Sequence, residues 1–226
     1  MDLTFIRHGE PAWSVDGLSQ LDPYLTERGH QQAKLAAERL AHDDRGFTEI
    51  IVSPARRSQQ TAAPIAEALG LEPVTIENIV EIKMPNWAGA PEEEVQKIFH
   101  DAQSRPEEEW WEGLPGGESF RDFHNRIVTA MDKLLAERGV VSIEEEHLWT
   151  VDDPTQRILV VAHGGTNSVA LGHLLNLQPT PWEWERLLLR HASLARTKTI
   201  ELAGAHTFSL RSFNDTEHLP REMQTR

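Results

Sequence analysis

The sequence predicts an α/β fold in which a mainly parallel sheet is covered by helices on both faces. Short apolar runs alternate along the chain with longer segments of helical periodicity, which is the pattern of strand–helix units. One run, RILVVA at residues 157–162, is almost continuously apolar, as expected of a strand buried on both faces. No internal repeat or linker interrupts the pattern, so we expect residues 1–226 to form a single domain.

The N-terminal third predicts two strand–helix units. A strand at residues 3–6 precedes a helix with Thr26 as its N-cap. The apolar residues on one face of this helix are Ala33, Ala36, Ala37 and Leu40. A short buried strand at residues 49–52 leads into a second helix, for which Ser53 is the expected N-cap and Pro54 the first helical residue. This helix is expected to end at Leu69 with Gly70 as its stop, and a short strand follows at residues 74–76.

The pattern is weaker in residues 81–115, where prolines and glycines alternate with tryptophans and one short helix is expected at residues 92–102. This segment is expected to form a roof over a ligand pocket. Its tryptophans, Trp87, Trp110 and Trp111, are candidates to stack on an apolar or ring-bearing group. Anchoring of the roof to the core is the interpretation that we favour for Trp110 and Trp111.

After Gly116 and Gly117 the chain predicts a long helix, whose apolar residues are Phe120, Phe123, Ile127, Met131 and Leu134. Residues 140–156 contain EEE and VDDP and predict an acidic, solvated surface excursion. The buried strand at residues 157–162 then leads into a helix opened by His163 to Thr166. Two last strands are expected at residues 195–202 and 207–213.

Composition excludes several classes of function. The formal net charge is −14, which disfavours nucleic acid or an anionic membrane as the partner of the whole surface. The chain has no cysteine, so disulfides, thiolate catalysis and cysteine-ligated metals are excluded. There is no signal-peptide pattern and no apolar run long enough to span a bilayer. We therefore expect a soluble, cytoplasmic protein.

Chemistry-bearing residues gather at three expected strand ends: residues 7–9 (RHG), residues 53–61 and residues 163–165 (HGG). Ligands of such sheets bind where strands end and helices begin. Helix N-termini and arginine side chains favour an anion there. Each segment alone also has an interpretation without function. RHG can occur by chance, Arg56 and Arg57 can form a solvated first helical turn, and the glycines after His163 can form a tight turn. Their combination predicts a phosphate site.

These segments resemble the histidine phosphatase superfamily, in its phosphoglycerate mutase-like branch 1. The matching stretches are IRHGE, LTERGHQQA, SPARRSQQTA, EIKMPNWAG, PGGESFRDFHNR, VVAHGGT and FNDTEHL, and they cover nearly the whole chain. The resemblance implies a three-layer α/β/α sandwich. It also implies catalysis through a phosphohistidine, with no metal ion and no cofactor.

The resemblance assigns roles to particular residues. His8 is the implied nucleophile, with the backbone carbonyl near Gly9 fixing its tautomer. Glu81 is the implied proton donor and acceptor, with Glu77 and Glu10 as available alternatives. The implied phosphate-binding residues are Arg7, Arg57, His163, Gly164 and Ser14, and His163 is also the second catalytic histidine. His191 and His218 receive no role.

The expected activity is hydrolysis of a small phosphate monoester, and two alternatives stay open. Mutases of this superfamily carry asparagine after the tryptophan that follows RHGE, whereas Ser14 follows Trp13 here. Between residues 81 and 117 the basic residues are only Lys83, Lys97 and Arg105, which gives little support for a bisphosphorylated cofactor. The alternatives are therefore a phosphoglycerate mutase-type transferase and a non-catalytic phospho-ligand-binding module. A small phosphorylated metabolite is the expected partner, and exposed sheet edges are compatible with a homodimer.

Overall fold

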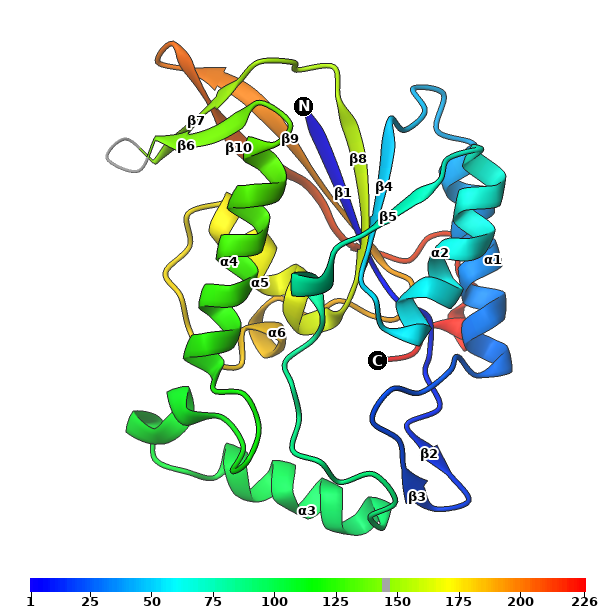
Figure 1. Cartoon of the computed structure of the whole chain (residues 1–226). Coiled ribbons are helices and arrows are strands. Elements are labelled where there is room, and N and C mark those ends of the chain that lie inside the picture. Colours follow the sequence, from blue (N-terminus) through cyan, green and yellow to red (C-terminus); the bar gives the residue numbers. More distant parts are fainter. Residues whose placement is uncertain (144–146) are drawn as a thin grey trace.

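A mixed sheet forms the centre of the molecule (Figure 1). The computed structural model describes residues 1–143 and 147–226, and in these residues the main sheet has eight strands. In sheet order they are β5 (Pro73–Thr75), β4 (Glu49–Val52), β8 (Arg157–Ala162), β1 (Asp2–Arg7), β9 (Leu194–Leu202), β10 (Ala205–Asp215), β7 (Leu148–Val151) and β6 (Val140–Ile143). The strands from β5 to β1 pair in parallel, and those from β9 to β6 pair antiparallel.

The register of the parallel strands sets up the site. Arg7, the last residue of β1, lies opposite Ala162, the last residue of β8. On the other side of β8, Val52 of β4 lies opposite Val161. The residues that follow these strands, His8, Ser53 and His163, therefore leave the same edge of the sheet side by side.

Helices cover both faces of the sheet and complete the predicted three-layer arrangement (Figure 1). The helices are α1 (Glu27–Ala41), α2 (Arg56–Leu69), α3 (Glu92–Gln103), α4 (Phe120–Ala136), α5 (Gly164–Leu174) and α6 (Glu183–Arg186), with single 3-10 turns η1 (Glu77–Ile79), η2 (Glu107–Glu112) and η3 (Arg221–Met223). One face packs against α1 and α2, and the other against α4 and α5. Each face has its own apolar core, because the fully buried residues of β8 point alternately to the two sides.

Most predicted elements are confirmed, among them the α1 cap. The Thr26 side chain accepts the N–H of Gly29 at 3.0 Å, a contact whose loss typically costs about 1 kcal/mol. Gly70 ends α2 in the left-handed conformation at φ 65°. The prediction for the start of α2 is wrong, because Ala55 is the N-cap and the helix begins at Arg56. The hydroxyl of Ser53 instead contacts a histidine, as described below.

The prediction of a solvated excursion at residues 140–156 is also wrong in its main part. Strands β6 and β7 pair as a hairpin, and β7 extends the main sheet beside β10. Leu148 and Trp149 are buried and hold β7 in place. The acidic EEE run, residues 144–146, lies outside the described residues.

The carboxyl ends of β1, β4 and β8 face the side of the molecule that carries α3 and a small hairpin (Figure 1). The hairpin consists of β2 (Ser14–Val15) and β3 (Leu18–Ser19). It binds the roof through the backbone, since the N–H of Ser19 donates to the Ala90 carbonyl at 2.9 Å. No helix in the described part of the chain has both the length and the apolar composition that a membrane crossing needs.

Candidate active site

His8 lies at the centre of the site, directly after β1. Its side chain is 2% exposed, and its backbone N–H donates to the Ala162 carbonyl at 2.9 Å, which continues the β1–β8 ladder. The Nδ1 atom lies 2.8 Å from the carbonyl oxygen of Gly9. Because a carbonyl only accepts hydrogen bonds, Nδ1 carries the ring proton and Nε2 keeps its lone pair. This is the tautomer required for attack through Nε2.

Gly9 is required by a close approach between two backbones. A Cβ at this position would lie 2.5 Å from the carbonyl oxygen of Gly29 in α1, closer than packed atoms allow. The Gly9 N–H donates to the Thr61 hydroxyl at 3.0 Å, and that hydroxyl donates to the Arg57 carbonyl at 2.7 Å. The loop after β1 is thereby held against the first turn of α1 and the second turn of α2.

Arg57 is the buried arginine of the pair at the start of α2, whereas Arg56 is exposed. The Nε–H of Arg57 donates to Nε2 of His8 at 3.2 Å. Its guanidinium lies 4.8 Å from the ring centre of Trp13, a cation–π contact, and 3.5 Å from an Asp22 carboxylate oxygen. The solvated interpretation therefore holds for Arg56 alone.

His163 completes the pair of facing imidazoles. It is the N-cap residue of α5, is fully buried, and its ring centre lies 5.2 Å from that of His8 in an edge-to-face arrangement. Its Nε2 lies 2.8 Å from the Ser53 hydroxyl, and its Nδ1 has no partner among the described protein atoms. The Ser53 oxygen also accepts the Ala55 N–H at 3.4 Å, and it can either accept from His163 Nε2 as well or donate to it. With Ser53 as the donor, Nδ1 of His163 carries the ring proton and can donate to an anion.

The electrostatic environment keeps both rings neutral. Burial lowers the pKa of His8 well below its usual value, and the nearby Arg57, His163 and Arg7 lower it further. Burial also lowers the pKa of His163 well below its usual value, with Arg57 and Arg7 as additional causes. Both effects disfavour imidazolium, so Nε2 of His8 is unprotonated at neutral pH.

Arg7 lies at the end of β1 with its side chain directed to the same edge. Its Nη1 donates to the Leu189 carbonyl at 2.7 Å, while its buried Nε has no partner among the described protein atoms. Burial lowers the pKa of Arg7 to about 10, so the guanidinium stays charged at neutral pH. A Cβ on Gly164 would lie 3.5 Å from this Nε. Arg7 and the start of α5 are therefore in contact.

Glu81 reaches the site from the segment that begins the roof. Its carboxylate accepts the N–H groups of Gly165 at 2.9 Å and Thr166 at 3.1 Å, both in the first turn of α5. It also accepts the N–H of Ile82 at 3.1 Å. A carboxylate has about four lone-pair positions, so these three bonds leave one for a further group. The negative charge of Glu81 also raises the pKa of Arg7 and Arg57 against the lowering by burial, which indicates its proximity to both.

The two alternative carboxylates lie elsewhere. Glu10 is engaged by the Thr26 hydroxyl at 2.9 Å and by Arg28 at 3.1 Å. Glu77 is exposed in η1. Ser14 lies in strand β2, next to Trp13, and within the described residues no side-chain hydrogen bond joins it to the histidine pair. In the same residues no three His, Asp or Glu side chains lie close enough to hold a metal ion.

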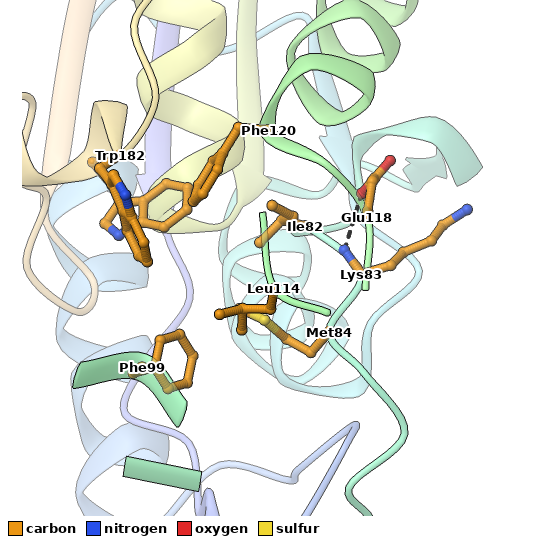
Figure 2. Close-up of a pocket in the computed structure, with 9 residues that line it drawn as sticks. Ile82, Lys83, Met84, Phe99, Leu114, Glu118, Phe120 and Trp182 are labelled. Atoms are coloured by element: carbon orange, nitrogen blue, oxygen red, sulfur yellow. Dashed lines mark hydrogen bonds between the residues drawn. The ribbon is translucent and has the colours of Figure 1, made fainter. Parts of the chain in front are cut away.

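An apolar recess lies beside Glu81, between the roof and the face of α4 (Figure 2). Its lining residues are Ile82, Lys83, Met84, Phe99, Leu114, Glu118, Phe120, Trp182 and Trp184. The Lys83 side chain points away from the apolar residues, while its backbone N–H donates to Glu118 at 2.9 Å. The cavity of about 10 Å³ has room for about one water molecule, so the roof packs closely on its floor.

The three roof tryptophans each contact another residue of the protein, either in the roof or in α4. Trp87 packs against Phe99, with ring centres 5.6 Å apart. The Trp110 indole N–H donates to the Arg105 carbonyl at 2.9 Å. The Arg121 guanidinium lies 5.0 Å from the Trp111 ring centre. These contacts favour the anchoring interpretation, and stacking on a ligand stays untested.

Three residues of the site receive no individual role from the sequence: Ser53, Thr61 and His191. Ser53 and Thr61 bound the predicted segment 53–61, in which Ser53 is assigned only as a helix cap. Thr61 lies in the second turn of α2, where no motif distinguishes it. His191 packs against His8 with ring centres 5.7 Å apart, a contact between residues far apart in the sequence.

The sequence of this chain is similar to those of known phosphatases and of probable phosphoglycerate mutases. The family model described as histidine phosphatase superfamily (branch 1) matches residues 3–216. The chain is 39% identical over 164 residues to phosphoserine phosphatase 1 of Hydrogenobacter thermophilus, covering 71% of this chain and 70% of that one. It is 33% identical over 232 residues to a probable phosphoglycerate mutase of Yersinia enterocolitica, covering 97% and 95%.

Solved structures of phosphatases also resemble this chain over nearly its whole length. A mycobacterial glucosyl-3-phosphoglycerate phosphatase superposes with a TM-score of 0.69 at 27% identity, covering 95% of this chain and 99% of that one. An alpha-ribazole phosphatase from Shigella flexneri superposes with a TM-score of 0.71 at 25% identity, covering 95% and 96%.

Proposed function

The chain belongs to the histidine phosphatase superfamily, and from this premise we propose that it hydrolyses a small phosphate monoester through a phosphohistidine on His8, without a metal ion. That it is a phosphatase enzyme follows from its family and from the phosphatases among its relatives and structural neighbours. The observation that carries the proposed mechanism is the hydrogen bond from His8 Nδ1 to the Gly9 carbonyl, which directs the Nε2 lone pair to the reacting side.

In the proposed first step, His8 Nε2 attacks phosphorus in line with the ester oxygen. An N–P bond forms, the P–O bond to the leaving group breaks, and the phosphoryl group is carried on His8. Arg57 donates to the same nitrogen in the structure, so its guanidinium lies where the phosphoryl oxygens arrive. Preorganised donors of this kind stabilise the charge that spreads over those oxygens in the transition state.

The remaining donors surround the same position. Arg7 Nε and His163 Nδ1 are buried polar atoms without a protein partner, and each can donate to a phosphoryl oxygen. The backbone N–H of Gly164 belongs to the N-terminus of α5, which favours an anion. Ser14 follows Trp13, whose ring lies against Arg57, and we include it as a contact at the rim of the site.

Glu81 is the proposed acid and base. In the proposal Glu81 enters the first step protonated and gives this proton to the leaving oxygen. In the second step the resulting carboxylate takes a proton from the attacking water, an O–P bond forms, the N–P bond breaks, and phosphate and neutral His8 are released. The support is its contact with the first turn of α5, directly beyond His163, together with its proximity to Arg7 and Arg57.

Phosphoryl transfer within a phosphoglycerate is the second candidate, favoured by the similarity to a probable phosphoglycerate mutase. The roof favours hydrolysis, because two of its three basic residues, Lys83 and Arg105, are directed elsewhere. The Lys83 side chain points away from the recess, and the Arg105 guanidinium donates to the Gly113 carbonyl at 2.8 Å. A second phosphate would find little cationic support there.

A panel of phosphate monoesters, assayed with excess chelator, tests the proposed function. We expect release of inorganic phosphate from at least one metabolite ester and no interconversion of 2- and 3-phosphoglycerate when bisphosphoglycerate is added. Efficient interconversion would replace the proposal with the mutase. Binding of phosphate or vanadate without turnover of any ester would replace it with a non-catalytic module.

Replacing Glu81 with glutamine is expected to lower the rate on an alkyl phosphate by about 10²- to 10⁴-fold, because the leaving alkoxide then has no proton donor. The rate on p-nitrophenyl phosphate should fall much less, since nitrophenolate leaves without protonation. The ratio of kcat/KM for the two esters is the measurement. Glu77→Gln, at an exposed carboxylate, is the matched control and should leave both rates unchanged. Equal losses on both esters in Glu81→Gln would contradict the role in leaving-group protonation.

A further inference from the structure

His191 is a buried histidine beside the nucleophile that the mechanism above does not use. It is 3% exposed, and its ring centre lies 5.7 Å from that of His8, with the two planes inclined by 37°. Its Nε2 has no hydrogen-bond partner among the described protein atoms. Buried polar groups are normally satisfied, so a lone imidazole nitrogen next to a reacting residue calls for a functional explanation.

The backbone next to this ring holds the nucleophile in place. The N–H of Ala192 donates to the carbonyl oxygens of Arg7 at 3.0 Å and of His8 at 3.2 Å. Ala192 has φ +53°, in the left-handed region that residues with a Cβ adopt at a cost of about 1–2 kcal/mol. Its carbonyl accepts a hydrogen bond from the His218 ring at 3.0 Å. Strain of this kind is typical of backbone that serves a site.

The C-terminal segment of the chain, residues 223–226, binds His191 at two points. The Thr225 carbonyl accepts the backbone N–H of His191 at 3.2 Å, and the Thr225 hydroxyl oxygen lies 2.9 Å from Nδ1 of the His191 ring. Arg226 forms an ion pair with Glu185 of α6. Figure 1 shows this end of the chain beside the start of α2, at the sheet edge where β1 ends.

Gln32, a fully buried residue of α1, connects this segment to the loop after His8. Its side-chain oxygen accepts the Glu10 N–H at 2.7 Å, which directs its amide nitrogen to the other side. That nitrogen donates to the Met223 carbonyl at 2.7 Å and to the Thr225 hydroxyl oxygen at 3.0 Å.

These contacts fix the orientation of the His191 ring. The Thr225 oxygen accepts from Gln32 and also bonds to His191 Nδ1. A hydroxyl can donate in that bond or accept for a second time, so Thr225 holds Nδ1 in either tautomer of the ring. Burial, with a smaller contribution from Arg7, lowers the pKa of His191 to about 2. The ring that packs on His8 is therefore neutral and fixed in orientation across the physiological pH range.

We propose that His191 is a positioning residue for the His8 nucleophile and that Thr225 and Gln32 hold it in place. The contacts form a closed circuit from Glu10 through Gln32, Thr225 and His191 back to His8. The C-terminal segment thereby acts through His191 on the orientation of the attacking nitrogen. This inference rests on the proposed function, in which His8 must keep its orientation to attack.

The hydroxyl of Thr225 offers a test with a matched control. Thr225→Val removes the hydroxyl at nearly constant shape, and Thr225→Ser keeps it. With p-nitrophenyl phosphate as the substrate and the full chain as the enzyme, we expect Thr225→Val to lower kcat tenfold or more, with KM within about twofold, because small misplacements of reacting groups are costly. Thr225→Ser should restore kcat to within about twofold. Full kcat in the valine variant, or an equal loss in both variants, would overturn the proposal.

His191→Phe separates the positioning role from general destabilisation. Phenylalanine keeps a ring against His8 but cannot form the hydrogen bond with Thr225. We expect a loss of kcat similar to that of Thr225→Val, and no further loss in the double variant, because the two residues act as one unit. If the double variant lost kcat by the product of the two single losses, the two residues would act independently, and this result would overturn the proposal.

A spectroscopic measurement decides the same question without substrate. In protein labelled with ¹⁵N-histidine, His8 should show a proton on Nδ1, and His191 should show a single fixed neutral tautomer. Thr225→Val should shift the imidazole nitrogen signals of His8, whereas Thr225→Ser should not. Unchanged His8 signals in Thr225→Val would overturn the positioning role even if no ester is hydrolysed. Failure of the proposed function appears separately, as an absence of turnover in the unmodified chain.

Discussion

Replacing His8 with alanine is expected to lower phosphate release by about 10⁴-fold or more, the scale of loss when a covalent nucleophile is removed. The expectation follows from geometry, because the Gly9 carbonyl holds the proton of His8 on Nδ1 and leaves Nε2 unprotonated for attack. Initial rates of phosphate release in the two proteins are the measurement.

The same variant tests for the covalent intermediate. Brief exposure of the unmodified chain to a ³²P-labelled ester should leave a label on the protein that is stable in base and lost in acid, as expected of a phosphohistidine. His8→Ala should carry no such label. His42→Ala, at an exposed histidine beyond the end of α1, is the matched control and should be labelled normally. Retained activity or label in His8→Ala would refute the phosphohistidine mechanism.

The sequence predicts the central histidines well for a physical reason. Arg7, His8 and His163 follow continuous apolar strands, and parallel strands bring their carboxyl ends to one edge. Local pattern therefore indicates both the existence of the site and its main side chains. The roles of these residues stay proposals until the variants are measured.

Other features depend on contacts that no local pattern encodes. Ser53 and Pro54 follow the statistics of helix starts, but the Ser53 hydroxyl binds a buried histidine and the helix begins at Arg56. The contact of Thr225 with His191 joins the chain end to the site, and only the folded backbone brings the two together. Such long-range side-chain bonds fix the orientation of the rings, and sequence periodicity carries no information on them.

The β6–β7 hairpin is the part of the main sheet that the sequence predicts least well. The acids near residues 144–153 suggest a solvated loop, whereas Leu148 and Trp149 belong to β7, which pairs with β10 on one side and with β6, the edge strand, on the other. Both side chains are buried, although acidic residues lie close to them on both sides in the sequence. These acids lead to the prediction of a loop where β7 lies. The two buried side chains of β7 hold it beside β10.

Acid is expected to unfold this protein steeply, because the native site holds three imidazoles neutral. Burial lowers the pKa of His8, His163 and His191, whereas histidines of an unfolded chain titrate near pH 6.5. Below that pH the unfolded state binds more protons than the native state, so the free energy of unfolding decreases as pH falls. Each histidine contributes a slope of about 1.4 kcal/mol per pH unit, or about 4 kcal/mol per unit for the three.

Between pH 7 and pH 5 the expected loss is about 5–6 kcal/mol, comparable to the whole stability of many domains. Urea unfolding at half-unit pH steps measures it, in buffers free of phosphate and sulfate, since a bound anion would stabilise the native site. His191→Phe removes one of the three titrating groups and should reduce the slope by about one third. An equal slope in both proteins would show that the His191 ring is protonated in the native state, contrary to its burial beside Arg7. A stability independent of pH over this range would contradict the neutral site altogether, and with it the free lone pair that attack by His8 requires.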